Sequence, residues 1–180
     1  MADASADVVD AVFATVAETA EDVRSALAER RAYDEAENPS GEQQLAADVY
    51  ADDLLEERLL TTDAVGGYAS EEREEGVLAE DGGEFFVACD PLDGSSNLKS
   101  NNGMGTIVGI YDRELPAPGS ALVAAGYVLY GPITTMVTAR DGTVTEYLLR
   151  DGQREVLNED VQLPEDPVVY GFGGRVPDWT

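Results

Sequence analysis

The first part of the chain carries apolar residues at the spacing of a helix. Between about Ser5 and Arg31 they recur every three or four positions and form one stripe, while acidic residues and arginine occupy the other faces. The residues of this stripe are Val9, Val12, Phe13, Val16, Ala20, Val23 and Leu27. The pattern predicts a structural helix that packs against a core, and nothing in it points to chemistry.

A polar segment, Asn38–Glu42, ends this pattern. Ser40 and, three residues on, Gln43 are typical of a helix N-terminus, because their side chains can satisfy free backbone N–H groups. We therefore expect a second helix that runs to about Leu60. The residues expected to face inward are Leu45, Val49, Leu55 and Leu59.

After the second helix the pattern changes to short apolar runs bounded by Gly, Asp or Pro, which are typical of strands. These runs are 65–69, 85–89, 106–111, one or two strands within 121–140, and a last one beginning at 168. Asp141-Gly142 and Asp151-Gly152 indicate hairpin turns. Two helices followed by a mainly β segment predict a single α/β (α+β) domain, 1–180, with helices layered on a sheet.

The composition narrows the class of protein. A hydrophobic content of 43% favours a globular chain over a disordered one. A single cysteine, Cys89, allows no internal disulfide and agrees with a reducing compartment. We find no apolar run of the roughly 20 residues that span a bilayer. The N-terminus carries acids where a signal peptide carries Lys or Arg, so we expect a cytoplasmic protein without a membrane partner.

The formal net charge of −26 is the most prominent bulk property, and Lys99 is the only lysine. Self-repulsion of this size destabilises a compact state in dilute buffer, but it is screened when the Debye length falls to about 3 Å near 1 M salt. The composition therefore predicts adaptation to high salt, and an acidic surface for a basic partner is the alternative. A nucleic-acid partner is disfavoured because the chain has no basic patch for phosphate contacts.

The strongest chemical motif is Asp90-Pro91-Leu92-Asp93-Gly94-Ser95-Ser96-Asn97, directly after the predicted strand 85–89. Two carboxylates three positions apart can converge on one hard cation, and Pro91 leaves neighbouring carbonyls free to face it. Gly94 permits a close approach, and the amides of Gly94, Ser95 and Ser96 can cradle a phosphate. Together these are the parts needed for metal-assisted phosphoryl transfer. The alternative is a solvated surface loop.

The chain contains no histidine. This excludes a histidine nucleophile, a Ser–His pair and a histidine-bearing zinc site. A set of ligands made only of oxygen atoms favours Mg²⁺, with Mn²⁺ as the alternative.

The eight-residue motif resembles that of class I fructose-1,6-bisphosphatases, and its core, Asp-Pro-x-Asp-Gly-Ser/Thr, is shared with inositol monophosphatases and their lithium-sensitive relatives. Three further blocks resemble the bisphosphatase branch, namely 38–44 with Asp48 six residues after Glu42, 105–111 and 122–131. The resemblance covers about 38–131. It implies a layered sugar-phosphatase fold with a mostly antiparallel sheet, and it matches the N-terminal, metal-binding half of that family.

The resemblance also implies roles for individual residues. The implied metal ligands are Glu42, Glu71, Asp90, the carbonyl of Leu92, and Asp93. Asp48 and Glu72 would act on the attacking water, and the scissile phosphate would be held by Gly94, Ser95, Ser96 and Asn97. Two alternatives stay open. Glu71 and Glu72 also read as part of a charged run ending at Glu75, and Asp48 also reads as a solvated helix acid paired in position with Asp52.

The activity implied by the resemblance is Mg²⁺-dependent hydrolysis of fructose 1,6-bisphosphate in gluconeogenesis, by direct attack of water activated by two or three ions. A homo-oligomer, dimer or tetramer, is implied for a full-length protein. The alternatives are an inositol-monophosphatase-like or other sugar-phosphate phosphatase, and a truncated, catalytically incompetent metal-binding fragment or assembly subunit. Glu84-Phe85 stands where many relatives carry Lys-Tyr for AMP, so we expect no AMP inhibition.

Overall fold

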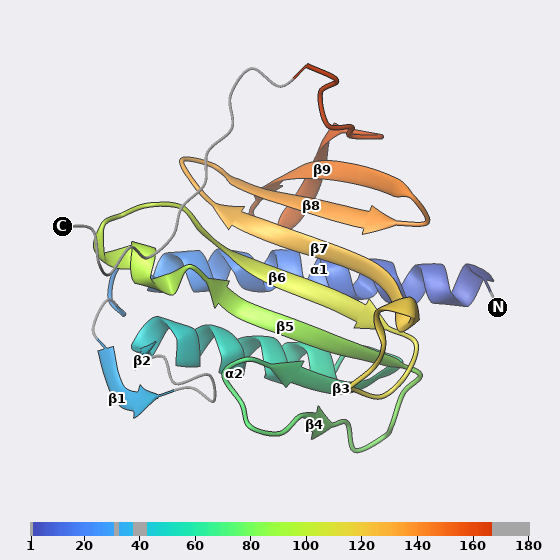
Figure 1. Ribbon diagram of the computed structural model, residues 1–180, viewed down its shortest axis with the longest axis horizontal. Helices are drawn as coiled ribbons and strands as arrows, with labels where there is room; N and C mark the ends of the chain where they lie inside the picture. The colour runs from blue at the N-terminus through green and yellow to red at the C-terminus, as the bar shows by residue number, and fades with distance from the viewer. Residues whose placement is uncertain (1, 31–32, 38–42, 167–180) are drawn as a thin grey trace.

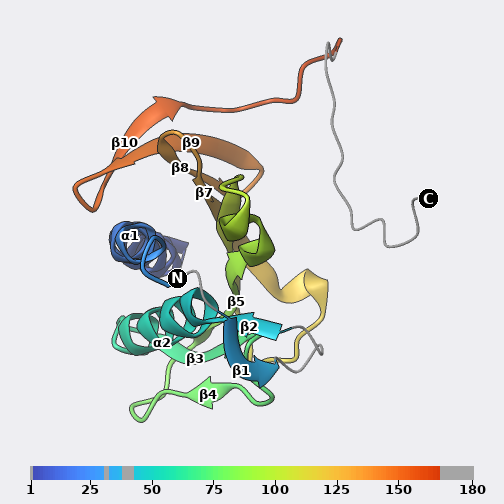
Figure 2. The same cartoon turned by 90° about the vertical axis from the view of Figure 1, so that its left-hand side faces the viewer.

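The computed structural model describes residues 2–30, 33–37 and 43–166. Within these residues two α-helices, α1 (Ala2–Ala26) and α2 (Ala46–Leu60), lie on the same side of an eight-stranded sheet, as Figures 1 and 2 show. The expected layered α/β arrangement, with its mostly antiparallel sheet, is therefore confirmed. No described helix is both long enough and apolar enough to cross a membrane.

The strands of the large sheet follow one another almost in chain order. The order across the sheet is β10-β9-β8-β7-β6-β5-β3-β4. Their bounds are β3 (Val65–Ser70), β4 (Val77–Leu78), β5 (Phe85–Asp93), β6 (Met104–Tyr111), β7 (Leu122–Tyr130), β8 (Thr134–Arg140), β9 (Thr143–Arg150) and β10 (Gln153–Asn158). Among the described pairs of this sheet only β3–β5 is parallel. The carboxyl ends of β3 and β5 therefore meet at one edge of the sheet.

The core lies between the two helices and the sheet. Six residues of the predicted α1 stripe, from Val9 to Val23, are at most 3% exposed, whereas Leu27 follows the end of the helix and is half-buried. Leu55 and Leu59 of α2 are buried as expected, and Val49 is half-buried. On β6 and β7 alternate residues point into this core, as the pleat of a strand requires.

The second helix begins later than the sequence predicts. It starts at Ala46, and Gln43 belongs to a short strand, β2 (Gln43–Leu45), which pairs with β1 (Tyr33–Glu37). Ser40 lies outside the described residues. The N-terminus of α2 is instead stabilised by Asp48, whose Oδ2 accepts the backbone N–H of Leu45 at 2.7 Å.

Two hairpin turns are confirmed at the positions that the sequence indicates. Asp141 and Gly142 have φ of 50° and 79°, and Asp151 and Gly152 have 51° and 69°. Positive φ at both central residues is the turn geometry that matches the twist of antiparallel strands. Strands β1, β2 and β4 were not predicted, and the strand expected from 168 lies outside the described residues.

The other face of the sheet carries exposed apolar side chains. Ile107, Tyr127 and Leu129 are 45%, 47% and 43% exposed. They alternate with the buried residues of β6 and β7 and therefore point away from α1 and α2. We call this surface, made by Ile107, Tyr127 and Leu129, the open face.

Candidate metal and phosphate site

The parallel pairing of β3 and β5 places two acidic segments side by side. Ser70 is in register with Cys89, and the backbone N–H of Glu71 donates to the carbonyl of Cys89 at 3.3 Å. Glu71 and Glu72 therefore follow the end of β3 next to the point where Asp90 continues β5. These two acids therefore lie beside the Asp90 motif.

Asp90 lies among other negative charges. It is half-buried, and its Oδ1 accepts the backbone N–H of Leu92 at 3.1 Å. Burial, followed by the charges of Glu71 and Asp93, raises the pKa of Asp90 to about 7. The side chains of Glu71 and Asp93 are exposed. A divalent cation at this position would offset the repulsion and favour the ionised carboxylate.

The motif begins inside a strand rather than in a loop. Strand β5 continues to Asp93, but its register with β6 shifts, since Asp90 pairs with Ile107 and Asp93 with Gly105. Three steps along β5 thus match two along β6, which is a β-bulge, a feature that often redirects side chains next to active sites. The sequence-based prediction that this strand ends at 89 is therefore wrong, because β5 continues to Asp93.

A buried hydrogen-bonded pair supports the bulge. Thr106, 1% exposed, donates its hydroxyl to the carbonyl of Pro91 at 2.8 Å and lies 2.9 Å from the hydroxyl of Tyr130. The Pro91 carbonyl is therefore used inside the protein and does not face a ligand. Neither Thr106 nor Tyr130 was singled out in the sequence, because their contacts join three strands that only the folded sheet brings together.

The phosphate segment starts with a left-handed residue. Gly94 has φ of 75°, and a short 3₁₀ helix, η1 (Ser95–Lys99), follows it. The backbone N–H of Asn97 donates to the Gly94 carbonyl at 2.8 Å, and its side-chain amide donates to the Gly103 carbonyl at 2.9 Å. Asn97 is thus held in the loop by two hydrogen bonds, and it fixes the entry of η1.

The two acids of α2 that face the sheet are both buried. Asp48 is 2% exposed and Asp52 is 4% exposed, so the alternative of a solvated helix acid is wrong for Asp48. Asp52 was not predicted as part of the site. The signal was present, because positions 48, 52, 55 and 59 share one helix face and the last two are apolar.

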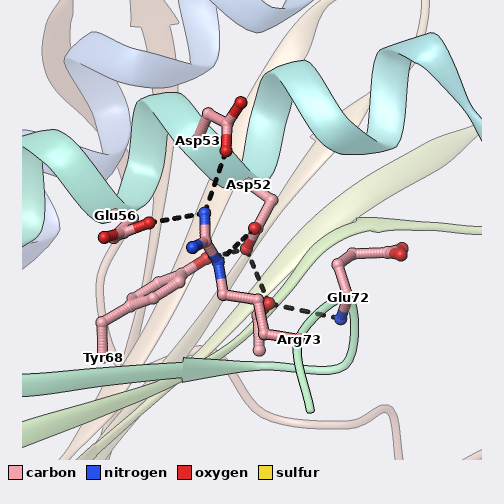
Figure 3. Close-up of polar contacts among 7 residues, drawn as sticks. Asp52, Asp53, Glu56, Tyr68, Glu72 and Arg73 are labelled. Atoms are coloured by element: carbon pink, nitrogen blue, oxygen red, sulfur yellow. Dashed lines mark hydrogen bonds and ion pairs between the residues drawn. The ribbon is translucent and has the colours of Figure 1, made fainter. Parts of the chain in front are cut away.

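Asp52 is at the centre of a network at the end of β3, drawn in Figure 3. Its Oδ1 accepts the hydroxyls of Tyr68 at 2.9 Å and Ser70 at 2.6 Å. The Ser70 hydroxyl oxygen in turn accepts the backbone N–H of Glu72 at 3.2 Å. Arg73, at the other end of the turn from Ser70, also donates to Asp52. These contacts tie the turn after β3 to helix α2.

The remaining predicted ligand, Glu42, lies outside the described residues. Within the part of the chain that is described, no three His, Cys, Asp or Glu side chains are already placed to hold one ion. The chemistry of the donors does fit a hard divalent cation, since Glu71, Asp90 and Asp93 offer only oxygen atoms and the charges of Glu71 and Asp93 both act on Asp90.

Comparisons with known proteins identify the family. Residues 7–156 match the family model described as the N-terminal domain of fructose-1,6-bisphosphatase. The chain is 66% identical over 181 residues to a class 1 fructose-1,6-bisphosphatase of Natronomonas pharaonis, covering all of this chain and 62% of that protein. It is 58% identical to the one of Halobacterium salinarum, covering 97% of this chain and 61% of that protein. The chain thus spans about three fifths of the length of the curated relatives it matches.

Solved structures share the fold. Fructose-1,6-bisphosphatase of Leishmania major in holo form aligns with a TM-score of 0.81 at 23% identity, over 89% of this chain and 56% of that chain. A sedoheptulose-1,7 bisphosphatase of Toxoplasma gondii, described as putative, aligns with a TM-score of 0.72 at 26% identity, over 82% of this chain and 53% of that chain. The fold, the ordered motifs and the matched domain lead to one conclusion: this chain belongs to the fructose-1,6-bisphosphatase family.

Proposed function

We propose that the chain carries the metal and phosphate site of an enzyme that hydrolyses fructose 1,6-bisphosphate to fructose 6-phosphate and phosphate. The observation that supports this most directly is the placement of Glu71 beside Asp90 at the ends of β3 and β5, followed immediately by Gly94 and η1. The acids and the backbone amides that we propose to bind phosphate thus lie at one edge of the sheet. The reaction belongs to gluconeogenesis in the cytoplasm.

The proposed metal ligands are Glu42, Glu71, Asp90, the carbonyl of Leu92, and Asp93. Bound Mg²⁺, two or three ions per site, supplies Lewis acidity and neutralises phosphate charge, and Mn²⁺ has the same preference for oxygen. The pKa of Asp90, raised first by burial and then by the charges of Glu71 and Asp93, supports this assignment.

The proposed phosphate contacts come from the start of η1. The first backbone N–H groups of a helix have no partner within the helix, so those of Ser95 and Ser96 are suited to phosphate oxygens. Gly94 turns the chain from β5 into this segment with its positive φ. Asn97 completes the loop. Asp48 and Glu72 are proposed to orient the attacking water and accept its proton.

The net charge of −26 supports function in concentrated salt, where repulsion between surface acids is screened. We propose a sugar bisphosphate as the partner, no nucleic acid or membrane, and a homo-oligomer for the full-length protein. Residues 1–180 are proposed to form one domain, equivalent to the N-terminal metal-binding half of the family.

A second candidate function, a domain that is inactive until another polypeptide completes it, is favoured by the open face. A groove of about 540 Å³ runs from Asp93, Gly94 and Asn97 to Tyr127 and Leu129. The occupant that we assign to it is the polypeptide equivalent to the 38% of the Natronomonas pharaonis relative that this chain does not span, since 62% is covered. That segment would bury the apolar side chains of the open face and close the groove beside Gly94 and η1.

Phosphate release tests these proposals. In about 3 M KCl, where the Debye length is below about 3 Å, the chain is given fructose 1,6-bisphosphate, sedoheptulose 1,7-bisphosphate or inositol 1-phosphate, with and without Mg²⁺. Release that needs Mg²⁺, is fastest with fructose 1,6-bisphosphate, is unaffected by AMP and is lost in Asp93→Asn supports the main proposal. Preference for inositol 1-phosphate would contradict it.

The same assay distinguishes the second candidate function from the main proposal. A polypeptide carrying the unmatched remainder of the Natronomonas pharaonis relative is added to the chain. A complex that forms and gains activity, and that is lost in Tyr127→Glu, supports a domain completed by a second segment. Full activity of the chain by itself, with no complex, overturns the second candidate.

A further inference from the structure

Arg73 has an unusual position in the sequence and in the structure. It is the only basic residue between Arg58 and Lys99, and it lies inside the acidic run Glu71–Glu75. Its guanidinium group points away from that run toward helix α2 (Figure 3). Nε lies 2.5 Å from Asp52, and Nη2 lies 3.0 Å from Asp53 and 2.5 Å from Glu56. Arg73 therefore joins the turn after β3 to three carboxylates of one helix.

Asp52 is the buried member of this group. Its side chain is 5% exposed, compared with 70% for Asp53 and 23% for Glu56. A buried carboxylate is strongly disfavoured unless it is hydrogen-bonded and paired. Both oxygens of Asp52 have partners, since Oδ1 accepts the hydroxyls of Tyr68 and Ser70 and Oδ2 faces Arg73. Burial also raises the pKa of Tyr68, so that this residue stays a neutral donor.

Two of the residues that bind Asp52 enclose the two glutamates of the candidate site. Ser70 precedes Glu71, and Arg73 follows Glu72. The Ser70 hydroxyl donates to Asp52 while it accepts the backbone N–H of Glu72. The turn that carries Glu71 and Glu72 is thus attached to one buried carboxylate at both of its ends.

We propose that Asp52 and Arg73 are positioning residues that hold Glu71 and Glu72 next to Asp90. This inference rests on the proposed function for the role of the two glutamates, but the attachment of the turn stands on its own contacts. We call the contacts of Asp52 with Ser70 and Arg73 the clamp.

The charges explain why such a clamp is needed. Glu71, Glu72, Glu74 and Glu75 lie within five positions and repel one another, and Glu71 also repels Asp90. Repulsion favours an open turn that moves Glu71 away from Asp90. Arg73 opposes this, because its planar group can bind several carboxylates of α2 at once, which a lysine cannot do in the same geometry.

Hydrogen exchange of the metal-free chain tests the clamp directly. The variants are Arg73→Gln and Ser70→Ala, which each remove one attachment. The control is Arg58→Gln, which removes an ion pair of α2 with Asp22, at 2.6 Å, on the side of α1. We expect amide exchange in 70–76 to become at least about tenfold faster in Arg73→Gln, with a smaller effect in Ser70→Ala and none in the control. Arg73→Lys should restore only part of the protection.

Mn²⁺ affinity, measured by titration of the same folded variants, separates positioning from stability alone. Partners that orient metal ligands typically change affinity by about 10- to 100-fold, so Arg73→Gln should weaken binding by about tenfold. Unchanged exchange in 70–76, or faster exchange throughout the chain, overturns the clamp. Local loosening with affinity within about twofold of the parent overturns the positioning role. A parent that binds no Mn²⁺ contradicts the proposed function, whereas the exchange result still decides the clamp.

Discussion

Glu71 donates its backbone N–H to the carbonyl of Cys89 at 3.3 Å, across the parallel pair β3–β5. This hydrogen bond extends the ladder one residue beyond Ser70 and fixes the register in which Glu71 lies next to Asp90. If β3 and β5 were antiparallel, Glu71 and Asp90 would lie at opposite edges of the sheet. The acidic site therefore depends on a single strand pairing, which adds the charge of Glu71 to burial in raising the pKa of Asp90.

The stability of the metal-free chain should depend on pH through Asp90. Its pKa rises from 3.8 in the unfolded chain to about 7 in the fold, so the folded state binds the proton more tightly. Stability from this group is present at low pH and is lost as pH rises from about 4 to about 7. Thermal unfolding at a series of pH values, in high KCl without divalent ions, measures the effect.

The matched variant is Asp90→Asn, which cannot ionise. The difference in melting temperature between variant and parent should increase from about pH 4 to about pH 7 and then level off. Mg²⁺ should reduce this difference above pH 7 by stabilising the ionised parent. A difference that is constant with pH contradicts the electrostatic account of Asp90.

Removal of one donor to Asp52 should destabilise the fold. In Tyr68→Phe the hydroxyl that binds Asp52 Oδ1 at 2.9 Å is lost, and the buried carboxyl group of Asp52 is left with fewer hydrogen-bond partners. We expect a loss of about 1–3 kcal/mol in the free energy of unfolding, measured with urea. Tyr127→Phe on the open face, where the parent side chain is 47% exposed, is the control and should change it by less than about 0.5 kcal/mol. Equal effects in both variants would argue against the Asp52 network.

Alanine substitutions at two glycines with similar backbone conformations distinguish an effect of backbone strain from an effect on phosphate release. Gly94 has φ of 75° and Gly82 has φ of 69°, and the latter lies in the turn before β5, at the opposite end of that strand. Alanine at either position should cost about 1–2 kcal/mol of stability, because a Cβ is disfavoured in the left-handed region. Only Gly94→Ala should also slow phosphate release, since it alters the entry to η1. Equal slowing in both variants would exclude a specific role of Gly94.

Dilution of salt should unfold the chain. The net charge of −26 is screened over about 3 Å at 1 M salt and over about 10 Å at 0.1 M. The melting temperature should therefore fall steadily as KCl is lowered, and NaCl should substitute for KCl. Sucrose, which stabilises folds without screening charge, should not substitute. A melting temperature independent of ionic strength contradicts the proposal of adaptation to high salt.

Much of the fold follows from the spacing of apolar residues. The α1 stripe, the Asp-Gly turns and the main strands of the sheet could be predicted because each is determined by residues close together in the chain. The predicted start of α2 was wrong. The helix is capped by Asp48, a residue inside the helix itself, and the sequence pattern of Ser40 and Gln43 did not indicate this. The short strands β1, β2 and β4 exist only through pairing, β1 with β2 and β4 with β3, which the residues of each strand alone do not show.

The candidate site was predictable only in part. The motif Asp90–Asn97 was found from the order of its residues and from the strand before it, whereas Glu71 and Glu72 were assigned only through the family resemblance. The bulge after Asp90 and its support by Thr106 and Tyr130 were not, because they arise from the register of β5 on β6 and β7. Arg73 read as one cation in an acidic run, and only the packing of α2 on β3 shows its contact with Asp52.

Calorimetric titration with Mg²⁺ tests the central claim most directly, namely that the acids at the ends of β3 and β5 form a divalent-metal site. The chain, Asp93→Asn and a control, Asp81→Asn, which removes an exposed acid near the opposite end of β5, are titrated in high KCl at about pH 8, above the pKa of Asp90. We predict binding to the chain and to Asp81→Asn, with at least about tenfold weaker binding to Asp93→Asn. Equal binding by all three proteins, or none by the folded chain, would contradict the account.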